Sequence, residues 1–344
     1  MNRIQYSTGG NITLAIDCVV SPAANGRILS WVDASHLKVN AELFLRLGDQ
    51  IVIVDTDTQI GWDNLDTGVA EAGKDYFVYA CLPAVTGDPP VFKISLNATY
   101  PSGYDADTSR KIGGFHTLCL AAGTISGHPL TGYATKAILP YSVWDLKWRP
   151  ASSDPRGLVY STKLNRWGDI YLMSGTGLNS ASAFGAAFTV SRDWNSFVDD
   201  LAAVGKRLMW DWEFQVFAEG SNEETNISGS ASPGTTGGHV DTAGRRMLSN
   251  IGCEDCCGVV WQWLLDQSYQ NDATYSSTWA YYDLPGAKGS LYRQGATGDV
   301  KLRAGGGWNL GSYCGSRARG ANGYRWAAAS DIGGRGCAEH LRLA

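Results

Sequence analysis

The chain has 344 residues, which is more than a single typical domain and makes two domains the starting expectation. Its formal net charge is -5, with Lys+Arg 28 against Asp+Glu 33, so it has no basic field and nucleic acid is not expected as a partner. Only 18% of the residues are charged, while glycine (42 residues), tryptophan (13) and tyrosine (16) are frequent. This composition is typical of a folded, loop-rich protein.

The N-terminus has no apolar run of the kind found in a signal peptide, because the turn-forming segment Ser7-Thr8-Gly9-Gly10 follows it closely. No segment approaches the roughly 18 consecutive apolar residues of a membrane span. The sequence therefore predicts neither a signal peptide nor membrane insertion. The 8 cysteines are irregularly spaced and do not indicate a redox compartment.

Residues 1–135 are expected to form a β-rich domain. Short runs at 51–54, 76–80 and 91–96 are rich in β-branched and aromatic residues, and turn clusters such as 86–90 separate them. This pattern favours a sandwich or a small barrel, whose role in mounting or oligomerisation is an expectation that the pattern alone does not test.

A turn-rich segment at 125–133 marks the expected junction to a second domain, residues 136–344. A helix is predicted from Ser196, a candidate N-cap, because Phe197, Leu201 and Val204 form one apolar stripe and Gly205 follows as a stop.

A second helix is predicted to begin at Asp211 and to run through Phe214 and Phe217 toward Gly220. The polar stretch from Gly220 to Gly238 is too long for a tight connection and is expected to be a long loop.

Several Gly, Trp, Cys and Arg motifs recur in a fixed order in the second domain. They are Gly-Lys-Arg-Leu at 205–208, Trp-Glu-Phe at 212–214, Gly-Val-Val-Trp-Gln-Trp at 258–263, Arg-Ala-Gly-Gly-Gly-Trp at 303–308, Cys-Gly-Ser-Arg-Ala-Arg at 314–319 and Gly-Gly-Arg-Gly-Cys at 333–337. Together with Asn-Ile-Gly-Cys-Glu-Asp-Cys-Cys-Gly at 250–258, this set resembles the formylglycine-generating-enzyme branch of the C-type lectin fold. It is most similar to the variable proteins of diversity-generating retroelements in phages and archaeal viruses.

The resemblance covers roughly residue 138 to the C-terminus and implies an α+β chain: a C-terminal C-type lectin-like domain of the formylglycine-generating-enzyme subclass after the β-rich domain. It implies a variable region at about 303–343 on a fixed scaffold. The scaffold residues expected there are Arg303, Gly306, Trp308, Cys314, Arg317, Arg319 and Arg335.

The scaffold residues also have a physical rationale of their own. The glycines at 305–307 permit positive φ and close backbone approach. Arg317, Arg319, Arg325 and Arg335 lie among few acids, so their guanidinium groups are expected to hydrogen-bond loop carbonyls.

Between the scaffold residues are ten positions that share no polarity, size or period. They are Asn309, Leu310, Tyr313, Gly320, Asn322, Gly323, Tyr324, Ala327, Ala329 and Asp331. In the family, template adenines are randomised, mostly in asparagine-type codons that end in a pyrimidine. Such codons can become Asn, Leu, Tyr, Gly, Ala or Asp, but not Lys, Glu, Gln, Met or Trp, and all ten residues agree. Ser330 fits less well.

The resemblance implies a virion attachment protein, in a tail or similar structure, that binds a host cell-surface protein or glycan, with no cofactor, no metal and no chemistry. Tyr313 and Tyr324 are expected to be the strongest contacts, because tyrosine offers a large, rigid, amphipathic surface. The ligand and the oligomeric state are not fixed by the sequence, and a homo-oligomer is compatible with it.

Two alternatives share the fold. A purely structural virion protein differs only in lacking a ligand. A formylglycine-generating oxidase would need a copper-binding cysteine pair, but only Cys314 is kept and the other position falls near Asn309-Leu310.

Other chemical sites have weaker support. Cys253, Cys256 and Cys257 have two-thiolate zinc spacing, but buried thiols or a local disulfide are favoured because no second close pair follows. Asp211 and Glu213 are interpreted as groups that cap and orient a helix. The histidines are scattered, and no Gly-x-Ser-x-Gly elbow occurs.

Overall fold

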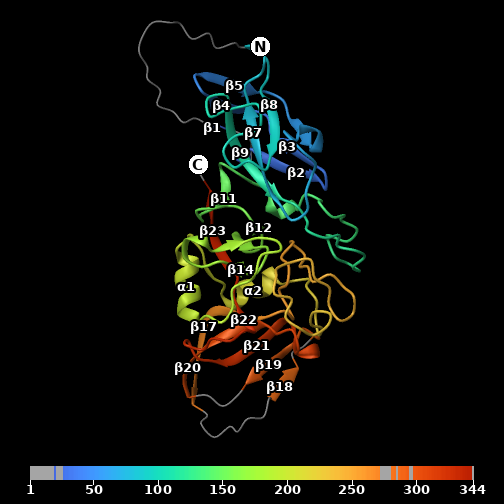
Figure 1. Ribbon diagram of the computed structural model, residues 1–344, viewed down its shortest axis with the longest axis vertical. Coiled ribbons are helices and arrows are strands. Elements are labelled where there is room, and N and C mark those ends of the chain that lie inside the picture. Colours follow the sequence, from blue (N-terminus) through green and yellow to red (C-terminus); the bar gives the residue numbers. More distant parts are fainter. Residues whose placement is uncertain (1–18, 21–25, 272–279, 284–285, 294–296, 343–344) are drawn as a thin grey trace.

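The computed structural model describes residues 19–20, 26–271, 280–283, 286–293 and 297–342. These residues are mostly β-structure, with two α-helices and short 3-10 turns. Figure 1 shows two units stacked along the long axis, the first coloured blue to green and the second green to red. The described segments include no helix with the length and apolarity needed to cross a lipid bilayer.

The first unit is built from three small sheets around one core. The sheets are β1 (Val19–Val20) with β4 (Leu43–Leu47) and β5 (Gln50–Val54); β2 (Leu29–Asp33) with β3 (His36–Val39) and β6 (Thr58–Gly61); and β7 (Asp75–Cys81) with β8 (Val91–Ser95), β9 (Ser109–His116) and β10 (Trp144–Asp145). A 3-10 turn, η1 (Trp62–Asn64), follows β6.

The alternation of side chains explains how these strands share a core. In β4, Leu43, Leu45 and Leu47 are buried while the residues between them face out, as the period of two along a strand requires. Buried residues from all three sheets form one cluster, while Phe77, Tyr79 and Cys81 on the other face of β7 pack with residues of the second unit. The strands expected at 51–54, 76–80 and 91–96 are confirmed as β5, β7 and β8.

The second unit begins after β10, which pairs with β9 and therefore belongs to the first unit's largest sheet. Its strands are β11 (Trp148–Pro150), β12 (Leu158–Ser161), β13 (Arg166–Asp169), β14 (Met173–Ser174), β15 (Ala181–Ser182), β16 (Arg207–Leu208), β17 (Trp261–Asn271), β18 (Ala280–Asp283), β19 (Ser290–Arg293), β20 (Thr297–Gly305), β21 (Gly315–Gly323), β22 (Ile332–Gly333) and β23 (Gly336–Arg342). Further 3-10 turns are η2 (Pro140–Ser142), η3 (Gly177–Asn179) and η4 (Gly311–Tyr313). The C-terminal strand β23 pairs with β11, β13 and β16, so the end of the chain closes a sheet begun much earlier.

Two α-helices pack in the second unit: α1 (Trp194–Ala202) and α2 (Asp211–Phe217). In α1 the apolar stripe is confirmed, because Phe197 and Leu201 are buried. The N-cap, however, is Asp193 and not Ser196. The Asp193 carboxylate accepts the backbone N–H of Ser196 at 2.8 Å, and a charged acceptor suits the positive end of a helix.

The start of α2 agrees with the prediction to within one residue. Trp210 is the N-cap and Asp211 is the first helical residue. The fully buried carboxylate of Glu213 accepts the backbone N–H of Trp210 at 2.9 Å. Its charge is compensated by Arg166 and Arg207, whose nearest nitrogens lie 3.0 and 2.7 Å away. The interpretation of Glu213 as a capping and orienting group is therefore confirmed.

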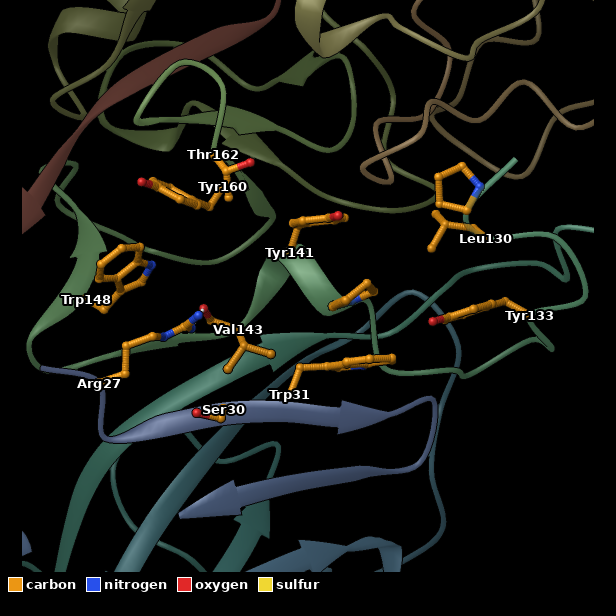
Figure 2. A pocket seen from close by; sticks show the side chains of 12 residues that line it. Arg27, Ser30, Trp31, Leu130, Tyr133, Tyr141, Val143, Trp148, Tyr160 and Thr162 are labelled. Atoms are coloured by element: carbon orange, nitrogen blue, oxygen red, sulfur yellow. Dashed lines mark hydrogen bonds between the residues drawn. The ribbon is translucent and has the colours of Figure 1, made fainter. Parts of the chain in front are cut away.

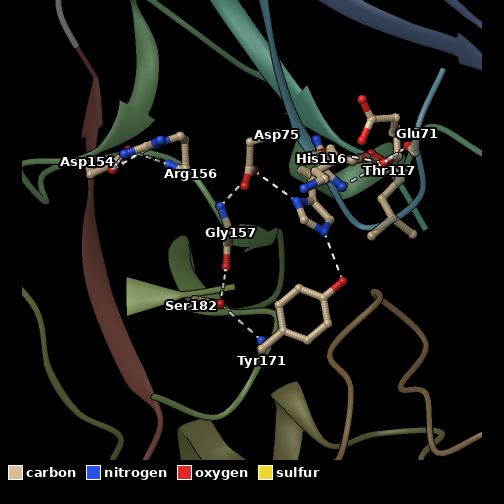
Figure 3. Close-up of polar contacts among 12 residues, drawn as sticks. Glu71, Asp75, His116, Thr117, Asp154, Arg156, Gly157, Tyr171 and Ser182 are labelled. Carbon is tan, nitrogen blue, oxygen red and sulfur yellow. Dashed lines mark hydrogen bonds and ion pairs between the residues drawn. The ribbon is translucent and has the colours of Figure 1, made fainter. Parts of the chain in front are cut away.

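A buried hydrogen-bond chain joins the two units (Figure 3). His116 in β9 bonds through Nδ1 to Asp75 of β7 and through Nε2 to the Tyr171 hydroxyl of the second unit, both at 2.9 Å. Asp75 also accepts the backbone N–H of Gly157 at 2.9 Å, and the Gly157 carbonyl accepts the Ser182 hydroxyl at 2.7 Å. Because both units supply members of this chain, it fixes how the second unit is mounted on the first.

Candidate functional site

The strands β20 and β21 lie at the end of the second unit that is far from the first unit, whereas the C-terminal strand β23 of the predicted variable region runs back toward the first unit (Figure 1). The ten predicted variable positions belong to β21 and to the segments that follow β20 and β21. The six-stranded sheet there runs in the order β18-β19-β21-β20-β17-β22. Two irregularities interrupt the β20–β21 pairing, between Lys301 and Arg303 and between Ala304 and Gly305. Such bulges bend the strands at the place where the exposed segments begin.

Glycine allows the first of these segments to leave the sheet. Gly305 and Gly306 have φ of 90° and 86°, which glycine adopts without the penalty of a side chain. A Cβ at Gly305 would lie 2.4 Å from the Cys256 carbonyl oxygen, and one at Gly306 would lie 2.7 Å from the Cys314 sulfur. The predicted role of this glycine run, positive φ with close backbone approach, is confirmed at these two positions.

Three buried arginines, Arg303, Arg319 and Arg335, hold neighbouring parts of this region together. Arg335 is 1% exposed and donates to Gln262 and to the carbonyls of Asp169, Ile170 and Glu254. It thereby ties the segment after β22 to parts of the chain far away in sequence.

Arg319 and Arg303 act closer to the surface. Arg319 is 7% exposed, donates to the carbonyls of Ser316 and Ala318 and forms an ion pair with Asp211 at the start of α2. Arg303 lies over the rings of Trp261 and Trp263 and donates to the side-chain oxygen of Asn322. The expectation of guanidinium-to-carbonyl bonds is confirmed for Arg319 and Arg335.

Arg317 and Arg325 differ from that expectation, since both side chains are exposed. No hydrogen bond from either guanidinium to a carbonyl occurs among the described residues. In Arg317 it is the backbone N–H that bonds, to the Lys288 carbonyl at 2.9 Å, and the Arg325 guanidinium lies 5.9 Å from the centre of the Trp194 ring. In a regular strand Arg317 and Arg319 would share one face, but the pairing of β21 with β20 is irregular between Gly315 and Arg319, so the two side chains have different surroundings.

The other two scaffold positions are partly or fully buried. Cys314 is buried, and its thiol donates to the Gly307 carbonyl at 3.3 Å. Trp308 is half-buried at the edge of a small apolar cluster, and its carbonyl accepts the amide of Asn226.

The ten predicted variable residues are not equally accessible. Asn309 is exposed, and Tyr313 is 40% exposed at the end of η4. Six more are half-buried: Leu310, Asn322, Tyr324, Ala327, Ala329 and Asp331. Among these, Leu310, Ala327 and Ala329 pack against the apolar cluster that contains Phe197, so only part of each side chain is accessible to solvent.

Gly320 and Gly323 lie in the interior. Gly320 is paired with Arg303, and a Cβ there would lie 3.3 Å from the guanidinium. A Cβ at Gly323 would lie 2.9 Å from the ring of Trp263. Gly320 and Gly323, two of the ten predicted variable positions, are therefore not on the accessible surface; they allow β21 to approach its neighbours closely.

Trp326 is a surface residue that sequence reasoning missed. Its side chain is 67% exposed and stacks on Tyr324, with ring centroids 4.9 Å apart and planes 1° apart. The Tyr324 hydroxyl accepts the backbone N–H of Thr297 at 3.3 Å, which holds the pair against the start of β20. The available signal was its place between two predicted variable residues, Tyr324 and Ala327.

The charge next to this surface is positive but partly buried. The Lys301 ammonium lies 4.1 Å from the centre of the Trp194 ring and 2.6 Å from the side-chain oxygen of Gln267. Burial and the nearby Arg325 lower the pKa of Lys301. Arg325 is an exposed cation beside the Trp194 ring, so the surface here combines aromatic side chains with an accessible positive charge.

The surroundings of Cys314 do not favour a reactive thiol. Burial raises the pKa of the Cys314 thiol to about 12, which disfavours the thiolate that a nucleophile or a copper ligand requires. Cys253, Cys256 and Cys257 are buried free thiols, one of the two accounts favoured from the sequence. The described residues contain no group of three or more His, Cys, Asp and Glu side chains placed to hold a metal ion.

Comparisons with known proteins agree with this architecture. Residues 27–145 match the sequence model of a family described as the Mtd second domain. The tail fiber receptor-binding protein of Bordetella phage BPP-1 is 29% identical over 333 residues, an alignment that covers 89% of this chain and 80% of that protein.

Solved structures extend the likeness to nearly the whole chain. The U1 variant of the major tropism determinant is 26% identical with a TM-score of 0.75, and the P3c variant is 25% identical with the same TM-score. Each comparison covers 95% of this chain and 87% of the other. The resemblance drawn from the sequence is confirmed: the chain has the mostly β, C-type lectin-like fold of these proteins.

Proposed function

We propose that this chain, which has the fold of the major tropism determinants, is a receptor-binding protein of a viral tail that recognises a host surface by binding alone. The similarity to a phage tail fiber receptor-binding protein supports this proposal. The observation that carries it is the exposure of Tyr313 and Trp326, at 40% and 67%, on a unit whose backbone is held in place by buried arginines. Large exposed aromatic side chains on a rigid support are typical of binding surfaces.

We define the binding face as the accessible side chains of Asn309, Tyr313, Tyr324, Arg325 and Trp326. Retroelement mutagenesis would change Asn309, Tyr313 and Tyr324 on the binding face. It would also change the other half-buried predicted positions at the edge of that face. Trp326 cannot arise from the randomised codon type, so it would be a constant contact beside variable ones. The partner would be a host cell-surface protein or glycan, whose identity is set by the residues present.

The rest of the chain has a supporting role in this proposal. The second unit would be the α+β, formylglycine-generating-enzyme-like form of the lectin fold. The sequence places its start near residue 136, and the pairing of β10 with β9 places it after β10. The first unit would mount the protein on the virion and bring copies together. One binding face of this size implies modest affinity, which several copies on one particle would raise through avidity.

Comparison of sibling viral isolates tests the diversified part of the proposal. The gene would be sequenced in each isolate, together with flanking DNA that should hold a near-identical template repeat. Substitutions should gather at the accessible predicted positions, while Arg303, Cys314, Arg319 and Arg335 stay constant. If the accessible positions are constant while the rest of the gene drifts, the protein is not diversified in this way.

Cell labelling separates a receptor-binding protein from a purely structural virion protein. Fluorescently labelled chain would be incubated with intact cells of the host in which the source virus propagates. Tyr313→Ala should reduce labelling about tenfold, because an exposed tyrosine at the centre of a binding surface contributes on the order of 1–2 kcal/mol. Tyr100→Ala in the first unit, at a comparably exposed tyrosine, should have no effect. Equal labelling by the two variants, or none by the parent protein, would exclude a receptor-binding role for this face.

A further inference from the structure

A hollow outside the binding face lies where the first and second units meet. It has a volume of about 460 Å³ and is lined from both units, by β2, by the segment around η2 and by β12. Figure 1 places these elements at the opposite end of the second unit from β20 and β21. The volume is within the roughly 300–1,000 Å³ of small-molecule sites in proteins.

Aromatic side chains form the walls, and most of them are fixed in orientation (Figure 2). The Trp31 indole nitrogen donates to the Ile138 carbonyl at 3.2 Å. Trp148 packs edge-on against Tyr160 with centroids 5.0 Å apart, and the Tyr160 hydroxyl donates to Asn165 at 2.7 Å. These rings are held by the protein's own packing, so a ligand would not have to order them.

Polar groups are interspersed among the rings. Tyr133 and Tyr141 are half-buried, and within the described part of the chain their hydroxyls have no hydrogen-bond partner. The Arg27 guanidinium donates to the Val143 carbonyl at 2.9 Å and lies 5.1 Å from the centre of the Trp148 ring. No carboxylate is among the lining residues that the structure describes.

This combination selects the class of ligand. The C–H faces of a pyranose ring pack on aromatic faces, whose electron-rich surface attracts weakly positive hydrogens, and the sugar hydroxyls need both donors and acceptors at the rim. Tyrosine hydroxyls supply both functions. An anionic ligand would find one guanidinium that already bonds a carbonyl, and a metal ion would find no carboxylate.

We propose that this junction pocket binds a neutral saccharide, a hexose or N-acetylhexosamine ring, against Trp31 and Tyr141. The site is separate from the binding face, so it goes beyond the receptor recognition proposed above and does not depend on retroelement mutagenesis. A saccharide there would contact both units at once. It would give the virus a constant, low-affinity hold on surface glycans beside the variable contact.

Saturation-transfer NMR on the full chain tests the proposal with three probes: D-glucose, D-galactose and N-acetyl-D-glucosamine. At least one should bind saturably with a Kd in the millimolar range, as befits a single ring in an open pocket. Trp31→Ala should weaken that binding about tenfold, because it removes a stacking surface. Tyr141→Phe keeps the ring and removes one hydroxyl, and should weaken binding about threefold; it decides the matter if Trp31→Ala does not fold.

The matched control is Trp326→Ala, which removes an exposed tryptophan from the binding face and should leave saccharide binding unchanged. Saturable binding lost in Trp326→Ala and kept in Trp31→Ala would place the saccharide on the binding face and overturn the proposal. So would the absence of saturable binding by all three probes. A decaproline peptide that binds in their place, or a change in sedimentation coefficient caused by Trp31→Ala, would identify a protein segment as the occupant and overturn it as well.

Discussion

Tyr324 and Trp326 stack face to face, with their ring planes 1° apart. Under the proposed function, Tyr324 would be at a position where retroelement mutagenesis acts, whereas tryptophan is a residue that this mutagenesis cannot create. The pair would then join a changeable ring to a constant one on the same surface. The exposed apolar surface of the two rings is unfavourable in water, and binding to a partner would bury it.

Trp326→Ala is expected to reduce host-cell labelling by at least tenfold, because tryptophan is the side chain that most often dominates a binding surface. Its thermal unfolding midpoint should stay within about 2 °C of the parent value, since a 67%-exposed ring contributes little to the core. Labelling and differential scanning calorimetry on the same preparation measure both effects. A large fall in the midpoint would make Trp326 a structural residue.

Arg335→Met is expected to lower the free energy of unfolding by about 3 kcal/mol or more. The guanidinium is 1% exposed, and its removal takes a donor from each of three interior backbone carbonyls, those of Asp169, Ile170 and Glu254. Arg317→Ala, at an exposed arginine, should change it by less than about 0.5 kcal/mol. Urea unfolding of both variants checks this contrast, and equal losses would contradict the assignment of the two side chains.

Gly323→Ala is expected to destabilise the second unit by about 1–3 kcal/mol, because the added methyl group would lie 2.9 Å from the Trp263 ring. Asn309→Ala, at an exposed position of the same region, is the control and should be close to neutral. The comparison needs only thermal unfolding of the two variants. A Gly323→Ala protein as stable as the parent would show that β21 has room for a side chain.

Acidity should affect the pair of His239 and Asp255. Burial lowers the pKa of His239, but its hydrogen bond to Asp255 at 3.0 Å and that carboxylate's charge outweigh burial and leave the pKa raised. A raised pKa in the folded state means that the pair stabilises the protein fully below the unfolded pKa of about 6.5. That contribution is lost as the pH rises through the folded-state pKa.

The destabilisation caused by His239→Gln should accordingly be larger at about pH 5.5 than at about pH 8.5. Urea unfolding of the parent and the variant at both pH values gives the two differences. The opposite order, or no change with pH, would mean that the pair does not carry a raised pKa.

Native cysteines should resist alkylation. The thiols of Cys81, Cys119, Cys253, Cys256, Cys257, Cys314 and Cys337 are buried. Cys18 lies outside the described residues, so Cys18→Ser provides the test protein. Iodoacetamide at about pH 8 should leave it unmodified until denaturant is added, because the reagent does not reach buried thiols. Rapid native modification of Cys314 would reopen an oxidase chemistry for this site.

The strands β5, β7 and β8 could be predicted from sequence because each is a short run rich in β-branched or aromatic residues between turn-forming segments. The apolar stripe of α1 could be predicted because its apolar residues recur at helical spacing. Its cap could not, because Asp193 and Ser196 are both good caps and only the backbone shows which oxygen accepts which N–H.

The site was harder to predict, because accessibility depends on strand pairing across long stretches of sequence. Gly320 is buried since it pairs with Arg303, and no local pattern around it shows that partner. Trp326 was missed for the opposite reason: a large aromatic residue is expected inside, and only the structure shows that it is two-thirds exposed.

The close approach of Gly323 to Trp263 also limits which sequence variants can be inherited. If template-directed mutagenesis reaches this codon, nearly every new residue would collide with the indole, and the offspring virus would carry a tail protein that fails before it meets a host. Glycine would then persist by selection in each generation, although the copying process treats its codon as freely as that of Tyr313. Such a virus would have fewer folded variants of its tail protein than its mutagenesis can encode, because the space around the Trp263 ring excludes the others.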